Sequence, residues 1–258
     1  MNPTRIFLLA GVAGATLASP LVQAQETPVA PVAPAAPQQA AAQEDPLLAH
    51  LDEEQTKEFW TYIQTASKHS AERKSLEALV VLEDASRLAP KHFAVQNLMG
   101  VSHMTLREFD KARNHFSLAR EVAPNNVGIR FNLAEVDFCS QNFEAALDQF
   151  TKIVEDNPKL PSKMFHLFRY KQIICLLKLD RTPEAEKMLA EFNAYESTPI
   201  YHMGQAAMEF SKGNESEAQG WILSTRSIYP TEVDTYLDAL MECGWVDSLM
   251  VPKVETGG

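Results

Sequence analysis

The sequence predicts an all-α solenoid, built from about five helix-turn-helix repeats and closed by a C-terminal capping helix. The first observation is a set of small, aromatic and proline residues that recurs at a fixed spacing of 34 residues: Ala112, Phe116 and Pro124 return as Ala146, Phe150 and Pro158. The second is that apolar residues keep a helical spacing from about residue 46 to residue 246. A period between about 20 and 50 residues is typical of solenoids, which stack copies of one supersecondary unit.

Residues 1–24 have the pattern of a signal peptide. Arg5 supplies a positive start, the 12 residues that follow it are apolar or small, and Val22-Gln23-Ala24 offers small residues where a signal peptidase reads. A membrane anchor is the alternative, but a bilayer-spanning helix needs about 20 apolar residues. We therefore expect cleavage after Ala24 and an exported protein, periplasmic or secreted, with no membrane insertion once the signal is removed.

The composition changes abruptly over residues 25–45: the run TPVAPVAPAAPQQAAAQEDP, which begins at Thr27, is mostly Pro, Ala and Gln, and its only large apolar residues are two valines. Such a segment cannot bury enough apolar surface to offset the entropy lost on ordering, and its prolines favour extended conformations. We expect a disordered linker between the export signal and a folded domain over residues 46–258. A proline-rich ligand for another domain is the alternative, but no aromatic or basic flank supports it.

The charge balance is acidic, with a formal net charge of −11 at pH 7. Removing the signal takes away one Arg and no acid, which leaves 22 basic and 34 acidic side chains and a net charge of −12. A field of this sign repels nucleic acid and anionic lipid headgroups, so neither is an expected partner. Much of the charge is typical of solvated helix surface and identifies no partner by itself.

The three cysteines, Cys139, Cys175 and Cys243, leave two interpretations open. In an oxidising compartment one disulfide could form and leave one thiol over. All three lie in helical apolar patterns, however, where a free Cys behaves as a small hydrophobic residue. The sequence favours three buried thiols.

The repeats can be placed in order along the chain. We expect them at about residues 59–92, 93–126, 127–160, 166–198 and 199–230, with the capping helix at about 231–246. In the second repeat Phe109 opens the second helix and Pro124 ends it. Gly100, twelve residues before Ala112, stands where two helices are expected to cross too closely for a larger side chain. Before the first repeat, Asp52-Glu53-Glu54 indicates a short polar entry turn or helix.

After Pro158 the phase slips by about five residues and then recovers. Pro183 stands where a helix should begin, which suits its fixed φ and its missing N–H donor. Gly213-Asn214 is predicted to form the turn of the last repeat, and Thr231 is the expected N-cap of the capping helix. Solenoids need such a helix to cover the exposed core of the final repeat.

These residues resemble the tetratricopeptide repeat (TPR), a helix-turn-helix unit of 34 residues. The positions that match its pattern are Gly100, Ala112, Phe116, Ala119 and Pro124 in the second repeat, Leu133, Ala134, Ala146, Phe150 and Pro158 in the third, and Ala78, Ala85 and Pro90 in the first. The sequence departs from the pattern at its early aromatic, where Gln96 and Arg130 stand, and at its Tyr, where His69, His103 and Asp137 stand. The resemblance implies a TPR-type α-α superhelix over roughly residues 59–230.

The resemblance also implies a concave groove lined by the first helix of each repeat. Its columns fall on Trp60, Ile63, Asn97, Val101, Met104, Phe131, Glu135, Phe138, Tyr170, Ile174, Leu177, Met203 and Phe210. This surface is unusually apolar for a face in water, and a large exposed apolar patch usually marks a partner site. We expect Phe131, Phe138, Ile174 and Phe210 to be partly exposed. The alternative is a groove covered by the chain's own segment at residues 46–51.

No motif for catalysis is present: the sequence has no Gly-rich phosphate loop, no HExxH, no Gly-x-Ser-x-Gly and no Cys-x-x-Cys. We therefore predict no enzyme and no cofactor. His69, His103 and Asp137 form a column at intervals of 34 residues. Successive helices lie about 8–10 Å apart, whereas metal ligands converge to about 2 Å from one ion. The column is better interpreted as structural filling of the Tyr-like position than as a metal site.

The sequence thus predicts a non-enzymatic scaffold or adaptor of the cell envelope that binds another protein or a peptide. The TPR family's way of gripping a peptide carboxylate uses Lys, Asn and Arg in the groove columns, and here only Asn97 and Asn132 are of the right type. The alternative function is binding of an envelope glycan or peptidoglycan, with Trp60 and Tyr170 stacking on sugars.

Overall fold

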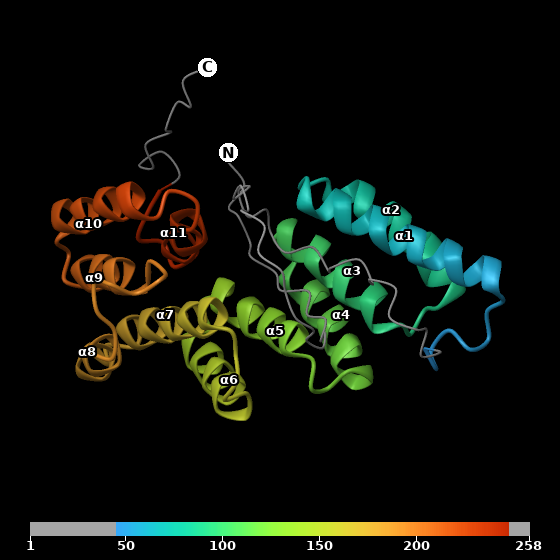
Figure 1. Ribbon diagram of the computed structural model, residues 1–258, viewed down its shortest axis with the longest axis horizontal. Coiled ribbons are helices and arrows are strands. Elements are labelled where there is room, and N and C mark those ends of the chain that lie inside the picture. The colour runs from blue at the N-terminus through green and yellow to red at the C-terminus, as the bar shows by residue number, and fades with distance from the viewer. Residues whose placement is uncertain (1–44, 248–258) are drawn as a thin grey trace, which may run out of the picture. The chain divides into compact units, whose positions relative to one another are not determined.

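The computed structural model describes residues 45–247, and all regular structure in that range is α-helical (Figure 1). The helices in that range are α1 (Glu53–Ala71), α2 (Ser75–Leu88), α3 (Phe93–Thr105), α4 (Phe109–Val122), α5 (Val127–Cys139), α6 (Phe143–Asp156), α7 (Ser162–Lys178), α8 (Thr182–Leu189), α9 (Ile200–Ser211), α10 (Glu215–Ile228) and α11 (Val233–Glu242). None of them combines the length and apolar character that a membrane crossing requires. The predicted signal peptide and nearly all of the predicted linker lie outside the described residues.

The chain divides into two compact units, whose described parts are residues 45–136 and 137–247. The boundary falls near the end of α5. The first contains α1 to α4 and most of α5, and the second contains α6 to α11.

Every helix pair is joined by the same turn. One residue of each turn has a left-handed backbone with φ between 57° and 78°: Arg73, Arg107, Gln141, Asp180 and Gly213. In each turn the next residue donates its backbone N–H to the carbonyl five positions earlier, as Glu108 does to His103 at 2.9 Å. This bond satisfies a carbonyl that the helix end would leave unpaired. The turns follow one another at intervals of 34, 34, 39 and 33 residues, which confirms the predicted phase slip and its recovery.

Prolines set the ends of four second helices. The residues that follow α2, α4, α6 and α10 are Ala89, Ala123, Asn157 and Tyr229, each with φ between −127° and −144°, and each precedes a proline. A residue before proline is disfavoured in the helical region, so the helix stops there. The predicted role of Pro124 is confirmed. Helix α8 is the exception, because no proline follows it and Ala190 keeps a helical backbone.

The core of residues 45–136 is closed at the crossing of α3 and α4. A Cβ atom added to Gly100 would lie 2.5 Å from Cε1 of Phe116, so any larger residue there would clash with that ring. Ala112, Phe116 and Ala119 are fully buried along the inner side of α4. The predicted close crossing is present, although the nearest neighbour of Gly100 is Phe116 rather than Ala112.

Residues 45–52 anchor the N-terminal end of the described chain. Leu48 is buried in the core cluster of the first helix pair, together with Phe59 and Leu82. Asp52 is the N-cap of α1, in a capping box with Gln55, so this helix begins at Glu53 rather than near Phe59 as the repeat register suggested. The entry segment is therefore a turn followed directly by the first long helix.

In residues 137–247 the fourth helix pair is unequal. Helix α7 has 17 residues and is buried on most of its circumference, whereas α8 has only 8. Pro183 stands in the first turn of α8, as predicted. The chain then runs without helix from Ala190 to Pro199 before α9 begins.

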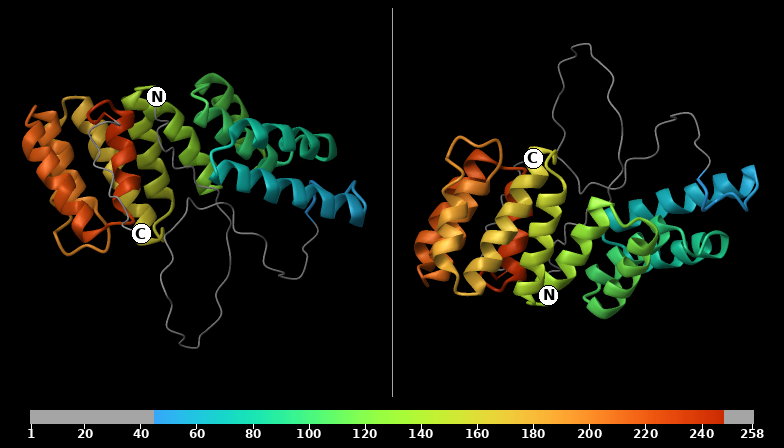
Figure 2. Two further views of the ribbon diagram at one scale, coloured as in Figure 1. Left: turned by 90° about the horizontal axis from the view of Figure 1, so that it is seen from above. Right: turned by 90° about the horizontal axis from the view of Figure 1, so that it is seen from below.

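Helix α11 differs from the predicted end cap in two respects. Its N-cap is Glu232, not Thr231, and the Thr231 hydroxyl donates instead to the Glu232 carboxylate at 2.6 Å. It packs on α7 and α9, which are first helices, as well as on α10 (Figure 2). A helix that only continued the stack would pack on the last pair, α9 and α10, so the contact with α7 means that α11 also covers part of the preceding pair.

All three cysteines are free and buried, which confirms the preferred interpretation. Cys243 lies just after α11, and burial raises the pKa of its thiol to about 12. Its thiol donates to the carbonyl of Leu240 at 3.3 Å. A thiol with this pKa holds almost no thiolate near neutral pH and is unreactive.

Candidate protein-binding face

We define the first-helix face as the set of groove positions predicted above. In residues 45–136 it comprises Trp60 and Ile63 on α1, Asn97, Val101 and Met104 on α3, and Phe131 and Glu135 on α5. All of them are buried except Trp60, which is half-buried. The Trp60 ring makes edge contacts with Phe59 and His92, at centroid distances of 5.2 and 5.5 Å. Trp60 is thus the most accessible aromatic side chain of this part of the face.

Two amides link α3 and α5 on this face. The side chain of Asn132 donates to Asn97 at 3.0 Å, and both residues are buried. A buried amide pair fixes the register of neighbouring helices, because an unpaired buried amide would cost free energy. These are the two asparagines that the family's carboxylate grip would require, and here the Oδ1 of Asn97 already accepts from the other amide.

In residues 137–247 the face comprises Phe138, Tyr170, Ile174, Leu177, Met203 and Phe210. All six are buried, and Phe131, Phe138 and Ile174 have no exposed surface, so the expected partial exposure of the four anchor residues is wrong. The reason is clearest at Phe138. Its ring meets Phe143 and Phe150 of α6 at centroid distances of 5.7 and 6.4 Å, so it points toward the second helix of its own pair and belongs to the core.

Helix α11 and the turn after it cover part of this face. The ring of Tyr236 lies 4.8 Å from that of Tyr170, and Trp245 stacks on Phe210 at 6.3 Å with 12° between the ring planes. The ammonium group of Lys178 lies 4.3 Å from the centre of the Trp245 ring. Two of the predicted groove aromatics, Tyr170 and Phe210, are therefore covered by aromatic side chains of α11 and the turn after it.

Polar contacts hold the N-terminal half of α11. Tyr236 donates its hydroxyl to Thr198 at 3.2 Å, and Thr198 also contacts Nδ1 of His166 at 2.8 Å. Burial raises the pKa of Tyr236, so its hydroxyl stays protonated and remains a donor. At the start of α11, Glu232 and Asp234 pair with basic side chains of α7 and α10, Lys163 at 3.5 Å and Arg226 at 3.2 Å.

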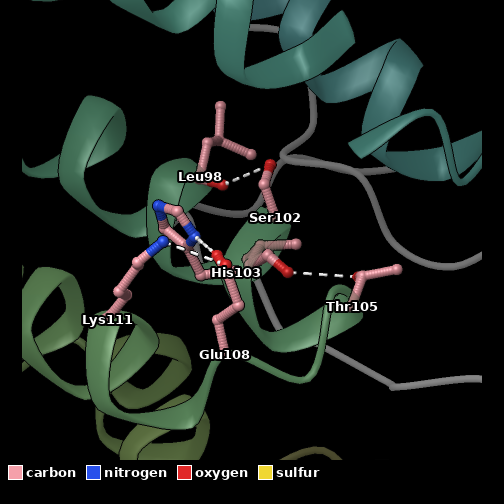
Figure 3. Close-up of polar contacts among 7 residues, drawn as sticks. Leu98, Ser102, His103, Thr105, Glu108 and Lys111 are labelled. Carbon is pink, nitrogen blue, oxygen red and sulfur yellow. Dashed lines mark hydrogen bonds and ion pairs between the residues drawn. The ribbon is translucent and has the colours of Figure 1, made fainter. Parts of the chain in front are cut away.

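In the column of His69, His103 and Asp137, the last two residues make hydrogen bonds to the turns that follow their helices. His103 Nδ1 lies 2.6 Å from a carboxylate oxygen of Glu108, and Lys111 contacts the same carboxylate at 2.9 Å (Figure 3). Asp137 likewise accepts from Asn142 at 3.2 Å. These contacts connect the end of a first helix to the start of its second, which fits the structural interpretation. Among residues 45–247 no three metal-ligating side chains converge.

Solved structures of TPR proteins resemble this chain, and two of them serve as examples. A tetratricopeptide repeat protein from Parabacteroides merdae ATCC 43184 aligns with a TM-score of 0.52 and 17% identity, over 73% of this chain and 75% of that one. A thermophilic TPR protein of Thermus thermophilus aligns with a TM-score of 0.54 and 18% identity, over 71% of this chain and 99% of that one. The chain has the TPR fold. No protein-family model and no curated protein sequence matches it.

The TPR register did not predict which side chains cover the first-helix face in residues 137–247. Tyr236 and Trp245 lie beyond the last repeat, where the family pattern has no fixed column. No local pattern announced this cover, because the large apolar residues of the helix, Val233, Tyr236, Leu237, Leu240 and Met241, lie on one side of it, as they would in an end cap. Tyr236, Leu237, Ala239 and Leu240 are all buried, whereas an end cap would leave its outer side polar.

A second feature of the TPR pairs was not predicted. An open cleft of about 480 Å³ lies between α6 and α8, with Leu147 and Met188 among its lining residues. Four carboxylates line it as well: Glu144, Asp148, Glu184 and Glu191. Arg181 pairs with Glu184 at 2.7 Å and approaches Glu144 at 3.6 Å, so its guanidinium offsets part of this negative charge.

Proposed function

We propose that this protein is a non-enzymatic scaffold that binds another protein or a peptide in the cell envelope, through the half-buried Trp60 end of its first-helix face and through the side of α7 and α9 that α11 now covers. The observation that carries the proposal is α11 itself. The side of α7 and α9 already holds a helix, through the contact of Tyr170 with Tyr236 and of Phe210 with Trp245. A surface that seats one amphipathic helix has the shape and the apolar character that helix-in-groove recognition uses.

The fold supports a binding role in general terms. TPR proteins are repeat scaffolds, and their extended surfaces suit binding of a protein segment better than they suit a convergent catalytic site. Net negative charge and the predicted export argue for a protein partner rather than a nucleic acid. The envelope assignment rests on the signal-peptide pattern of residues 1–24.

One of the two residues expected to stack on sugars in the alternative function, glycan binding, is not accessible. Tyr170 is fully buried beneath Tyr236, so a sugar ring has no access to it in this conformation. Trp60 is half-buried and makes edge contacts with its neighbours. Sugar binding needs an exposed aromatic face paired with polar groups, and protein binding is therefore the better-supported function.

Photo-crosslinking in the native cell tests the binding role. A photoreactive amino acid at position 60 lies on the first-helix face of α1, and one at position 76 replaces Leu76, an exposed residue on α2. We expect a discrete crosslinked protein from position 60 and none from position 76. Equal crosslinking at both positions, or none at either, would contradict a binding role for this face.

N-terminal sequencing of the protein recovered from a native host tests the export part. The expected first residue is Gln25, in the soluble fraction. A chain that keeps Met1 to Ala24, or that partitions into membranes, would refute the soluble envelope assignment while leaving the binding role to be judged by the crosslinks.

A further inference from the structure

We propose that α11 is an internal stand-in for a partner helix, and that the side of α7 and α9 binds an acidic amphipathic helix of the partner after α11 is displaced. This inference rests on the proposed function and names the partner's chemistry. It follows from three features: how α11 is seated, how well it fits, and what charge surrounds it.

The seat of α11 is apolar and specific. Val233, Leu237 and Leu240 are nearly or fully buried, and Tyr236 packs its ring on Tyr170. After the helix, Gly244 adopts φ 79° and allows the chain to turn so that Trp245 reaches Phe210. Together these side chains form a pattern in which apolar residues at positions 233, 236, 237 and 240 face the TPR helices, as in a helix bound in a groove.

The fit of α11 is incomplete. The hydroxyl of Tyr170 is fully buried and finds no hydrogen-bond partner among residues 45–247. Burial and the neighbouring Cys243 and Tyr236 raise the pKa of Tyr170, so the group stays a protonated donor that lacks an acceptor. Leaving a buried donor unsatisfied costs free energy. A partner helix that placed an acceptor there would fit this face better than α11 does.

Other properties make α11 a weak occupant. It has only 10 residues, and no side chain caps its N-terminus. Short helices are marginal alone and depend on packing. It also carries Asp238 and Glu242 into nearly buried positions, at 6% and 7% exposure. Taking a carboxylate out of water is costly even when it is paired, so part of the gain from apolar burial is offset.

The charge of this region indicates an acidic partner. Residues 232–242 contain four acids and no base. The helices beneath supply cations: Lys163 pairs with Glu232, Arg226 pairs with Asp234, and Lys178 lies over the Trp245 ring. A partner helix with Asp or Glu beside Tyr and Leu anchors would keep these contacts. A basic helix would place like charges together, which disfavours binding.

Cys243 provides a built-in reporter of displacement. Its thiol is almost fully buried at the end of α11, and its raised pKa of about 12 protects it further. Cys139 lies on α5 and is also buried, so it reports opening of the protein elsewhere. Pulsed alkylation of the unmodified full chain, read for each cysteine by mass spectrometry, follows both thiols in one sample.

The probe is a synthetic peptide of residues 230–247 with Cys243→Ser. The control peptide also carries Tyr236→Ser and Leu240→Ser, which remove two apolar anchors and keep the charge. We expect saturating probe peptide to raise the alkylation rate of Cys243 about tenfold, because the fraction of molecules with α11 displaced should rise by that factor. The alkylation rate of Cys139 should not change. The control peptide should change neither rate.

Three outcomes would overturn the inference. An unchanged Cys243 rate at saturating peptide would make α11 a fixed part of the fold. Equal acceleration at Cys139 would mean that the peptide opens the protein generally. A Cys243 rate that rises with protein concentration alone would indicate exchange of α11 between two copies of this chain, not binding of a different partner.

A second measurement does not depend on thiols. In the full chain, Leu240→Ala weakens the packing of α11 on α7 and α9. We expect the fluorescent probe peptide to bind this variant about tenfold more tightly than it binds the unmodified chain, because α11 then competes less strongly for the same surface. Circular dichroism checks that the variant is folded, and equal affinity for the two folded chains would refute displacement. Crosslinking at position 60 probes the other unit, so it can succeed when these tests fail.

Discussion

Helices α4 and α8 occupy equivalent places in two TPR pairs, yet they end in different ways. The turns before them are alike, because Arg107 and Asp180 both adopt a left-handed backbone and the residue after each bonds to the carbonyl five positions back. Helix α4 then runs for 14 residues and stops just before Pro124, whereas α8 has 8 residues and no proline after it. The turn is therefore maintained by backbone hydrogen bonds, while the length of the second helix depends on local sequence.

The first helices of the two pairs show the consequence. In the α3–α4 pair, the Phe116 ring fills the space over Gly100. In the α7–α8 pair the short second helix covers less, and α7 packs also on α6, α9 and α11. The apolar character of α7 on nearly all sides fits this arrangement, since a helix covered all round needs no polar face. A short second helix thus goes with additional cover from elsewhere in the chain.

The largest expected effect on stability comes from truncating a large buried side chain in α4 and in α8. Phe116→Ala should lower the free energy of unfolding by about 3–5 kcal/mol, because it leaves a large cavity over Gly100. Leu189→Ala, the corresponding change in α8, should cost about 2 kcal/mol, at the low end for a buried Leu. Chemical denaturation of both variants measures the difference. If Leu189→Ala is the more damaging change, α8 contributes more to its pair than its length suggests.

The next effect concerns the helix crossing. Gly100→Ala should destabilise the protein by about 1–3 kcal/mol, because the new Cβ meets the rigid Phe116 ring at 2.5 Å. Gly204→Ala should cost less, since its Cβ meets the end of the flexible Leu189 side chain. Gly220→Ala in α10 is the matched control, and with open space around it should stabilise its helix by about 0.5–1 kcal/mol. A neutral Gly100→Ala would mean that α3 and α4 can separate slightly without penalty.

Sequence reasoning predicted the repeated pairs better than the binding face, and the difference has a physical cause. The period is carried by residues whose role is local: Phe116 and Gly100 meet within one pair, and Pro124 acts on its own neighbour. The slip of five residues was visible for the same reason. The exposure of the face was predicted wrongly because the repeat register tells which side of its helix a residue lies on, but not what packs against that side. Phe138 packs against α6 and is not exposed to solvent. The seat of α11 depends on contacts far along the chain, which no local pattern encodes.

A smaller effect is expected on acidification. Burial lowers the pKa of His202, whose Nδ1 is buried and finds no hydrogen-bond partner among the described residues. The unfolded chain therefore takes up this proton more readily, and the stability contributed at neutral pH falls as the pH drops below about 6.5, the ordinary value for His. We expect His202→Phe to reduce the slope of unfolding free energy against pH between about 7 and 5. Tyr201→Phe, which alters the same aromatic cluster without removing an imidazole, should keep the slope of the unmodified chain.

The smallest expected effect on stability concerns the left-handed residue in the turn that joins each helix pair. Gln141 holds φ at 62°, where a residue with a side chain is strained, and Gly213 holds φ at 78° in the equivalent turn. Gln141→Gly should relieve that strain but make the unfolded chain more flexible, so the net change should be a stabilisation below about 1 kcal/mol. Gly213→Ala should destabilise by about 1 kcal/mol, since it introduces the strain, even though no atom lies within 4 Å of the added Cβ. Thermal and chemical denaturation of the two variants compare the turns directly. If both substitutions destabilise the protein equally, the left-handed residue is not what distinguishes these turns, and their common hydrogen bonds alone determine their shape.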